Sequence, residues 1–150
     1  MKITRKGEYA MRALVDLASN YRKGMRQIQD IVREEAIPEK FLEQILIMLK
    51  NAGFIQSKRG LGGGYFLNKP PDKISLGEVI RVVDGPIGPL SCVDKRDGNC
   101  SKEVVCGIRS VMLDVNNAMA EILDRVTLAD VCSRTKGMAE RRTQTIMYYI

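Results

Sequence analysis

The chain has 150 residues, 45% of them hydrophobic and 28% charged, which is typical of a globular protein with room for one buried core. No apolar run approaches the roughly 20 residues that a transmembrane helix needs, and the N-terminus lacks the continuous apolar stretch of a signal peptide. We therefore expect a cytoplasmic protein with no membrane partner. The chain has no histidine, which excludes catalytic triads that use this residue as a base.

The positive charge is distributed unevenly along the chain. Residues 1–75 contain 14 Lys and Arg against 8 Asp and Glu, whereas residues 76–150 contain 10 of each kind. All of the net charge of +6 therefore lies in the first half. This asymmetry favours a polyanion-binding module joined to an electrically neutral remainder.

Helical periodicity dominates the first fifty residues. Apolar residues recur every three or four positions from Ala10 to Tyr21, which predicts a helix that ends near Lys23 and Gly24. A short second helix is predicted around 28–32, and Pro38 is suited to the first turn of a third. The apolar stripe of this third helix consists of Phe41, Leu42, Ile45, Met48, Leu49 and Ala52.

A glycine-rich hairpin is predicted next, in the run FIQSKRGLGGGYFLN over residues 54–68. Two short stretches of aromatic and branched residues flank the glycines, which permit a tight, twisted turn. Pro70 and Pro71 end the second strand. Ser75 and Glu78 have the spacing of a capping box and predict a fourth helix that runs to Val83.

A long helix is predicted after the loop that follows Gly85. Its apolar residues alternate in steps of three and four, which is the heptad spacing of a helix that packs against a partner helix. The helix could pack on its own domain, but pairing with a second copy is favoured because twofold dimers are the commonest oligomers. Thr127 and Asp130 then predict a short last helix before a polar tail. The predicted dimer seam comprises Val105, Ile108, Met112, Val115, Met119, Ile122 and Val126.

Three helices followed by a hairpin predict a mainly α fold with a small β-hairpin wing, the winged helix-turn-helix. In that fold the third helix enters the major groove of DNA, and cations of the wing reach phosphates or the minor groove. Glu43 can accept a hydrogen bond from cytosine, and Gln44 can pair with an adenine edge. Lys58 and Arg59 lie at the predicted wing tip. The same residues could be ordinary surface residues, and winged helices also bind proteins.

Three cysteines lie close together in CVDKRDGNCSKEVVC, at Cys92, Cys100 and Cys106. In the cytoplasm such clusters more often bind metal or sense redox state than form structural disulfides. Zinc would need a fourth ligand, and Cys132 is separated from Cys106 by a helix of roughly 30 Å. The residues alone leave open an iron–sulfur site, thiol redox sensing, zinc and inert thiols.

Three segments together resemble the Rrf2 family of bacterial transcription regulators: MKITRKGEYAMRALVDLA, EKFLEQILIMLKNAGFIQSKRGLGGGYFLNKP and ISLGEVIRVVDGPIGP. The resemblance implies a homodimer that binds palindromic promoter DNA through two winged helices and dimerises through the long helix. It implies a winged helix-turn-helix domain over 1–84, a cysteine sensor loop over 85–106, a dimerisation helix over 107–126, and a short helix with a tail over 127–150. It assigns DNA contacts to Lys40, Glu43, Gln44, Lys58, Arg59 and Gly60, although Lys40 departs from relatives that have a small residue there.

The resemblance also implies a cofactor. Family members that bind an iron–sulfur cluster, [2Fe–2S] or [4Fe–4S], hold it with three cysteines at the positions of Cys92, Cys100 and Cys106. Arg109 stands where cluster-assembly regulators have a histidine ligand, and a guanidinium cannot ligate iron. Relatives without that histidine can use an acidic residue of the partner subunit, and Glu8 matches its position.

The C-terminal residues point to a second kind of relative. TLADV and the final MYYI resemble the tail of a cysteine-metabolism repressor that forms a complex with cysteine synthase and lacks the three loop cysteines. The leading hypothesis is a cluster-binding transcription regulator, not an enzyme. The alternative is a cluster-free repressor of sulfur metabolism, controlled by thiol oxidation or by cysteine synthase. An iron–sulfur electron-transfer or carrier protein is a third possibility, but it would have no use for a basic wing.

Overall fold

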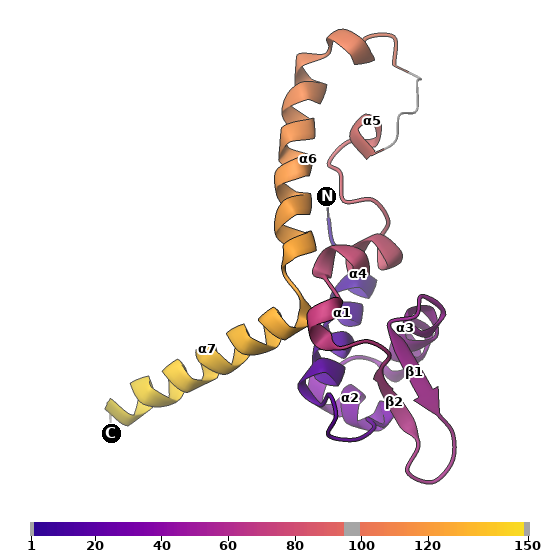
Figure 1. Ribbon diagram of the computed structural model, residues 1–150, viewed down its shortest axis with the longest axis vertical. Coiled ribbons are helices and arrows are strands. Elements are labelled where there is room, and N and C mark those ends of the chain that lie inside the picture. Colours follow the sequence, from indigo (N-terminus) through magenta and orange to yellow (C-terminus); the bar gives the residue numbers. More distant parts are fainter. Residues whose placement is uncertain (1, 95–99, 149–150) are drawn as a thin grey trace.

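The computed structural model describes residues 2–94 and 100–148. Within these residues helices dominate, and the β-structure is one two-stranded antiparallel hairpin, as the sequence predicts. Figure 1 shows an N-terminal unit from which one long helix rises beside the cysteine segment, while the last helix projects to the side. The elements are α1 (Arg5–Ser19), α2 (Ile28–Glu35), α3 (Glu39–Asn51), β1 (Ile55–Lys58), β2 (Gly64–Leu67), η1 (Pro71–Lys73), α4 (Leu76–Val83), α5 (Ser91–Asp94), η2 (Glu103–Val105), α6 (Gly107–Arg125) and α7 (Leu128–Tyr148).

α1 is the central helix of the N-terminal unit, and α2, α3 and α4 all contact it. It ends at Ser19, earlier than the predicted Lys23 and Gly24, because the Asn20 side chain donates a hydrogen bond to the carbonyl of Asp16 and caps the helix. Burial of each large aliphatic side chain of this core contributes about 1.5–3 kcal/mol. The core includes Ala10, Ala13, Leu14, Leu17, Ile31, Ile37, Leu42, Ile45, Leu46, Leu49, Phe54, Ile55, Leu67, Ile74, Val79 and Val83.

Phe41 departs from the predicted apolar stripe of α3. Its side chain is exposed rather than buried, and its ring packs edge-on against Tyr9 of α1 with ring centroids 6.2 Å apart. Leu42, which belongs to the same predicted stripe, is fully buried. α3 begins at Glu39, so Pro38 is its N-cap residue rather than part of its first turn. The remaining buried residues of α3 face α1, and the helix is anchored on one side only.

The wing is a short hairpin with a third segment attached to it. β1 and β2 pair in register from Ile55 with Leu67 to Lys58 with Gly64. Arg26 pairs with Tyr65 on the other edge of β2, through an N–H to carbonyl distance of 2.9 Å in one direction and 2.8 Å in the other. A side chain at Gly64 would place its first carbon 2.6 Å from the Arg26 carbonyl oxygen. Glycine is therefore required where the wing meets this segment.

The side chain of Arg26 ties the same segment to the helices. Its guanidinium donates two hydrogen bonds of 2.9 Å to the carboxylate of Asp16 on α1, and it lies 3.3 Å from Glu34 on α2. Asp16 is 3% exposed and Arg26 is 16% exposed. Hydrogen bonding to Asp16 raises the pKa of Arg26 above its usual value. One residue thus connects α1, α2 and the wing.

α4 begins and ends with polar interactions that fix its position. The predicted capping box is confirmed: the Ser75 side chain accepts from the Glu78 N–H, and Glu78 accepts from the Ser75 N–H at 3.0 Å. At the other end, the Asp84 carboxylate accepts from the backbone N–H of Thr4 at 2.9 Å and from its hydroxyl at 2.5 Å. A side chain at Gly7 would collide with this carboxylate. The start of α1 is therefore held against the end of α4.

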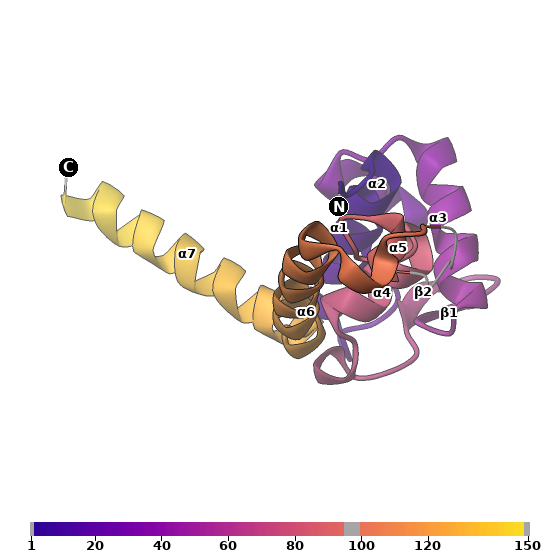
Figure 2. The same cartoon turned by 90° about the horizontal axis from the view of Figure 1, so that it is seen from above.

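α6 packs along α4, as Figures 1 and 2 show from two directions. Arg81 of α4 donates two hydrogen bonds to Asp124 of α6, at 2.5 and 2.9 Å, and this interaction lowers the pKa of Asp124 below its usual value. The two helices can approach because residue 77 is glycine, since a side chain there would overlap the Asp124 carboxylate. This contact joins the winged domain to the long helix.

α7 is longer than the sequence predicts. The expected short helix with a polar tail is instead one helix from Leu128 to Tyr148, capped by Thr127 and Asp130 as predicted. Its sequence has no continuous apolar stripe, so periodicity gave no signal for its later turns. Leu128 is its buried residue among those described, and Cys132 lies 3.4 Å from the Ser19 hydroxyl of α1. No helix in residues 2–94 and 100–148 is long and apolar enough to cross a bilayer.

We predict that Asp16→Ala lowers the free energy of unfolding by roughly 2–4 kcal/mol, because it leaves the guanidinium of Arg26 without its principal partner. Chemical denaturation monitored by circular dichroism measures this change. The matched control is Asp30→Ala, which removes a carboxylate from the exposed pair with Arg33 and costs at most about 1 kcal/mol. Equal losses for the two variants would contradict the structural role of Asp16.

Candidate nucleic-acid interface and cysteine loop

α3 presents one face to solvent, and this face carries the predicted base-reading residues. Lys40, Glu43 and Gln44 are all exposed, whereas Leu42, Ile45, Leu46 and Leu49 on the opposite face are buried. One side of the helix therefore packs on the core, and the other side is exposed to solvent. Long polar side chains on such a face can reach base edges in a major groove.

Two further residues of this face were not among those predicted to contact DNA. Ile47 is exposed, and Lys50 donates a hydrogen bond from Nζ to the Ser57 hydroxyl of β1 at 2.7 Å. The Lys50 contact fixes the end of α3 to the wing. Helical spacing from Glu43 places both residues on the exposed face, but it does not indicate the contact with Ser57.

The wing tip exposes the predicted cations. Lys58 ends β1, and both Arg59 and Gly60 are exposed in the turn that follows. Gly60 has a φ of 97°, and the Gly63 N–H donates to the Gly60 carbonyl at 2.9 Å, which closes the turn. A groove of about 270 Å³ lies between wing and α3, with Lys50, Lys58 and Arg59 along it. Positive side chains therefore flank the exposed face of α3 on the wing side.

The cysteine loop lies at the far end of the molecule from the wing (Figure 1). Cys92 belongs to α5 and Cys106 is the N-cap of α6, while Cys100 is exposed. All three are free thiols. Residues 95–99, between the first two cysteines, lie outside the described residues.

Arg109 connects the segments that carry the cysteines. Its Nε donates to the Cys92 carbonyl at 3.2 Å, its guanidinium lies 3.4 Å from Glu103, and its backbone N–H donates to the Cys106 sulfur at 3.4 Å. The side chain is only 22% exposed. The sequence identified Arg109 as a residue that cannot ligate iron, and its positioning role was not predicted.

The donor set of the loop fits an iron–sulfur cluster. Such clusters take thiolate ligands, and the loop supplies three sulfurs, one of which, that of Cys106, lies at the start of α6. Within one chain, the described residues contain no group of three His, Cys, Asp or Glu side chains close enough to hold a metal ion.

Glu8, the predicted fourth ligand, lies in the first turn of α1. Its carboxylate is 47% exposed and is 3.5 Å from Arg12 and 3.7 Å from Arg5. The structure does not place it beside the cysteines of its own chain.

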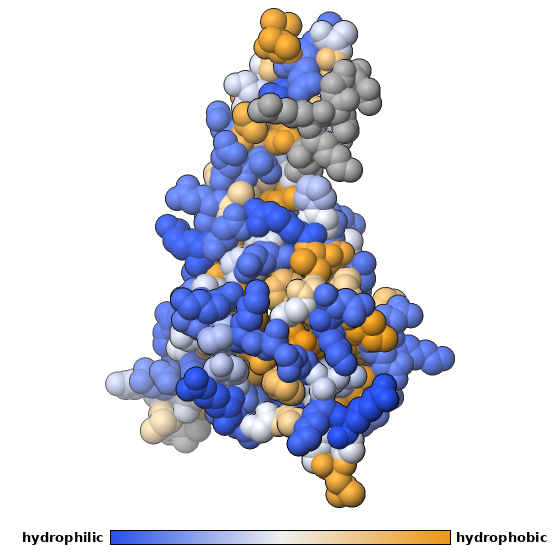
Figure 3. Space-filling view, turned by 45° about the vertical axis from the view of Figure 1, so that its right-hand side comes forward, coloured by the Kyte–Doolittle hydropathy of each residue, from blue (hydrophilic) through white to orange (hydrophobic). Residues whose placement is uncertain are grey.

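The predicted dimer seam of α6 is largely uncovered in the single chain. Among the described residues, none of α6 is buried, although α4 and α5 contact it. Figure 3 shows separate apolar side chains among polar ones along the upper part of the molecule. The exposed apolar residues of this region are Val104, Val105, Ile108, Val111, Val115 and Ile122, while Met112, Met119 and Val126 are half-buried.

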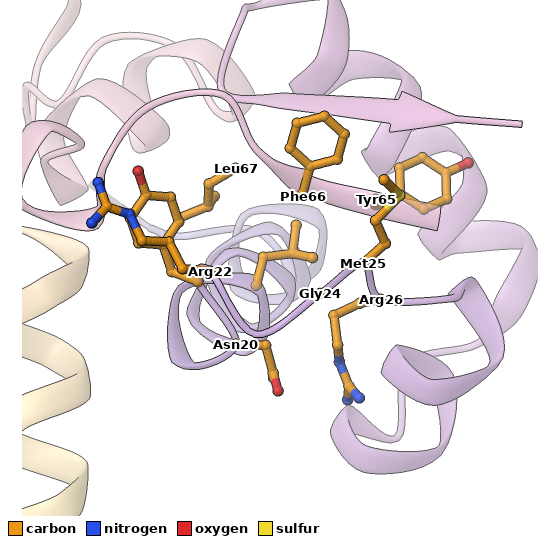
Figure 4. Close-up of a pocket in the computed structure, with 10 residues that line it drawn as sticks. Asn20, Arg22, Gly24, Met25, Arg26, Tyr65, Phe66 and Leu67 are labelled. Carbon is orange, nitrogen blue, oxygen red and sulfur yellow. The ribbon is translucent and has the colours of Figure 1, made fainter. Parts of the chain in front are cut away.

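The winged domain also contains a hollow of about 400 Å³, shown in Figure 4. Met25 from the loop after α1, and Tyr65 and Phe66 from β2, contribute to its lining. The walls are mainly apolar, and none of the three loop cysteines or the predicted base-reading residues lines it. This hollow is therefore separate from both candidate sites.

Comparison with known protein families shows which family has this architecture. The model of a family described as an iron-dependent transcriptional regulator matches residues 3–134. The chain belongs to the Rrf2 family. The predicted winged-helix fold is that of this family's solved members, and its members are transcription regulators that bind DNA rather than enzymes.

Two curated relatives cover most or all of the chain. The HTH-type transcriptional regulator CymR of Bacillus subtilis is 35% identical over 150 residues, which is 100% of both chains. The HTH-type transcriptional regulator IscR of Cronobacter sakazakii is 34% identical over 153 residues, covering 96% of this chain and 93% of that one. The two kinds of regulator match about equally well, so similarity does not decide between them.

Among solved structures, too, both kinds of regulator resemble this chain. CymR, described as the global cysteine regulator of B. subtilis, has a TM-score of 0.77 with 33% identity, covering 89% of this chain and 98% of that one. T. potens IscR has a TM-score of 0.73 with 32% identity, covering 90% of this chain and 88% of that one. The decision between the two kinds of regulator must come from the residues of the loop.

We predict that Arg109→Gln increases the rate at which a maleimide modifies Cys92 and Cys106 in the metal-free protein. Loss of charge-assisted hydrogen bonds, each worth about 1.5–3 kcal/mol, frees the two segments and should raise the rates about tenfold. Mass spectrometry of the labelled peptides measures the rates, with Cys132 as internal reference. Arg125→Gln, at the far end of α6, should leave them unchanged, and equal rates in both variants would exclude the positioning role of Arg109.

Proposed function

We propose that the protein is a dimeric transcription regulator that binds palindromic promoter DNA and carries an iron–sulfur cluster in the loop formed by Cys92, Cys100 and Cys106. The observation that supports the cluster is the set of three free thiols whose segments Arg109 holds together at the start of α6. The proposed signal is iron–sulfur status, redox state or nitric oxide, each of which acts on a cluster directly.

The DNA-binding step uses α3 and the wing. Lys40, Glu43 and Gln44 face base edges in the major groove, where donors and acceptors distinguish the base pairs. Lys58 and Arg59 contact phosphates or the minor groove, with the backbone of Gly60 close to the DNA. Support comes from the exposure of all these residues on one side of the winged domain.

The dimer forms through α6, and its seam supplies the driving force. Ile108, Val115 and Ile122 are exposed in the single chain, and burying them against a second copy removes apolar surface from water. Met112, Met119 and Val126 line the same seam. Twofold symmetry then presents two copies of α3 to two half-sites, which accounts for a palindromic operator.

The cluster would be held by the three loop thiolates and by Glu8 of the partner subunit. A cluster of this type supplies a redox-active centre whose loss or modification changes the loop that holds it. The chain's own residues transmit that change: Asp84, close before the loop, holds Thr4 and thereby the start of α1, and α1 packs on α3. A carboxylate ligand shared between subunits makes the dimer part of the sensor.

The second candidate is a cluster-free repressor of cysteine metabolism, regulated by thiol oxidation or by cysteine synthase bound to the C-terminal tail. It is favoured by the 35% identity to CymR over the whole chain and by the exposed Met147 and Tyr148 near the end of α7. We rank it second because a disulfide formed by thiol oxidation uses only two cysteines, and control by cysteine synthase through the tail uses none of the three. Anaerobic purification separates the two candidates, since the first predicts a coloured protein and the second a colourless one.

We predict that the protein binds its own promoter with an affinity that falls steeply with salt. Arg59→Ala should weaken binding and lower the slope of log K against log salt by about 2 per dimer, because two phosphate contacts are lost. Fluorescence anisotropy at several salt concentrations measures the slope. Lys73→Ala removes one exposed positive charge from η1 and should change neither quantity. A salt-independent or absent interaction would reject DNA binding.

We predict that Cys92→Ala abolishes the visible absorption of anaerobically purified protein, because one of three sulfur ligands is lost. Glu8→Ala should retain colour but lose the cluster several times faster in air, since solvent replaces the carboxylate. Absorption and EPR spectra follow both variants, and Glu140→Ala on exposed α7 serves as the control for loss of a carboxylate. Cluster lifetimes that are equal in Glu8→Ala and Glu140→Ala would reject Glu8 as a ligand.

A further inference from the structure

An apolar residue lies in the middle of the polar face of α3. Ile47 is 60% exposed, and its neighbours on the exposed face are Lys40, Glu43 and Gln44. A helix turns by about 100° per residue, which places Ile47 in angle between Glu43 and Gln44. Ile47 is therefore at the centre of the surface that faces DNA, not at its margin.

The spacing of the four side chains is that of a reading helix. Positions 40, 43, 44 and 47 follow the pattern i, i+3, i+4 and i+7, the same pattern by which the third helix of homeodomains contacts bases. Ile47 lies about 4.5 Å along the axis beyond Gln44, at 1.5 Å per residue. This offset is comparable to the spacing of base pairs, about 3.4 Å, so Ile47 is in range of a base edge other than the one that Gln44 contacts.

The wing supports this placement. Ile47 lines the groove between α3 and the wing together with Lys50, Lys58 and Arg59. Lys50 is bonded to Ser57, so the end of α3 is fixed relative to the cations of the wing. When these cations neutralise phosphates, Ile47 is held beside the base edges in the major groove of the DNA.

We propose that Ile47 selects a thymine in the operator by contacting its C5-methyl group. The thymine methyl is the one apolar group that the four bases present in the major groove. Against any other base edge, the aliphatic side chain would cover donors or acceptors without pairing them, which costs free energy. Ile47 is thus a specificity-determining residue, and this assignment rests on the proposed DNA-binding function.

The test removes the methyl group from the DNA and the side chain from the protein. An operator is first selected from random duplex DNA with the full-length, anaerobically prepared protein, and each thymine is then replaced by uracil, which lacks only the methyl. Affinities are measured for the wild type, Ile47→Ala and Ile47→Ser. Val82→Ala is the matched control, because it truncates an exposed branched residue on α4, which contacts α1 and α6.

The wild type should lose affinity about fourfold per half-site at one thymine position, the factor expected for one buried methyl group. Ile47→Ala and Ile47→Ser should bind thymine and uracil equally at that position, whereas Val82→Ala should behave as the wild type. Wild-type binding that tolerates uracil at every position would overturn the role of Ile47 and leave the DNA-binding function intact. So would a uracil effect that persists in both Ile47 variants. Failure to select any DNA would reject the proposed function itself.

Discussion

The buried ion pair between Asp16 and Arg26 is the interaction on which the DNA-binding surface depends. Arg26 joins α1 through Asp16, α2 through Glu34, and the wing through its backbone pairing with Tyr65. The wing has only two strands of its own, and an isolated hairpin of that size is marginally stable in water. The angle between the wing and α3 is therefore set by Arg26 and by the contact between Lys50 and Ser57.

A second set of polar contacts determines where the cysteines lie. Arg81 with Asp124 fixes α6 against α4, and Asp84 with Thr4 fixes the end of α4 against the start of α1. The cysteine loop leaves the winged domain just after Asp84 and returns into α6 at Cys106. The loop is thus far from the DNA surface, but its first end is connected to α1 through the contact of Asp84 with Thr4. We propose that a change in the loop acts on α3 through α1, which packs on both α3 and α4.

Much of this architecture was predictable, for reasons of periodicity. The apolar stripes of α1 and α3, the glycines of the wing and the capping box of Ser75 carry strong local signals, and they predicted the winged helix. The length of α7 was underestimated because the sequence pattern of a polar helix without a buried face does not differ from that of an irregular tail. The contacts of Arg26, Arg109 and Lys50 join segments distant in sequence, and one sequence contains no signal for such pairs. The candidate ligands could be predicted by their residue types. The position of Glu8 relative to the three cysteines, however, depends on a second chain.

We propose that the state of the cysteine loop controls the affinity of the protein for DNA. The most direct measurement follows visible absorption and promoter binding on the same anaerobic sample, before and after the iron is removed by a chelator. We expect a coloured dimer whose affinity for its operator changes severalfold when the colour is lost, with the original affinity restored by reconstitution. A protein that is colourless after iron-replete anaerobic purification, or one whose affinity stays the same after chelation, would contradict it.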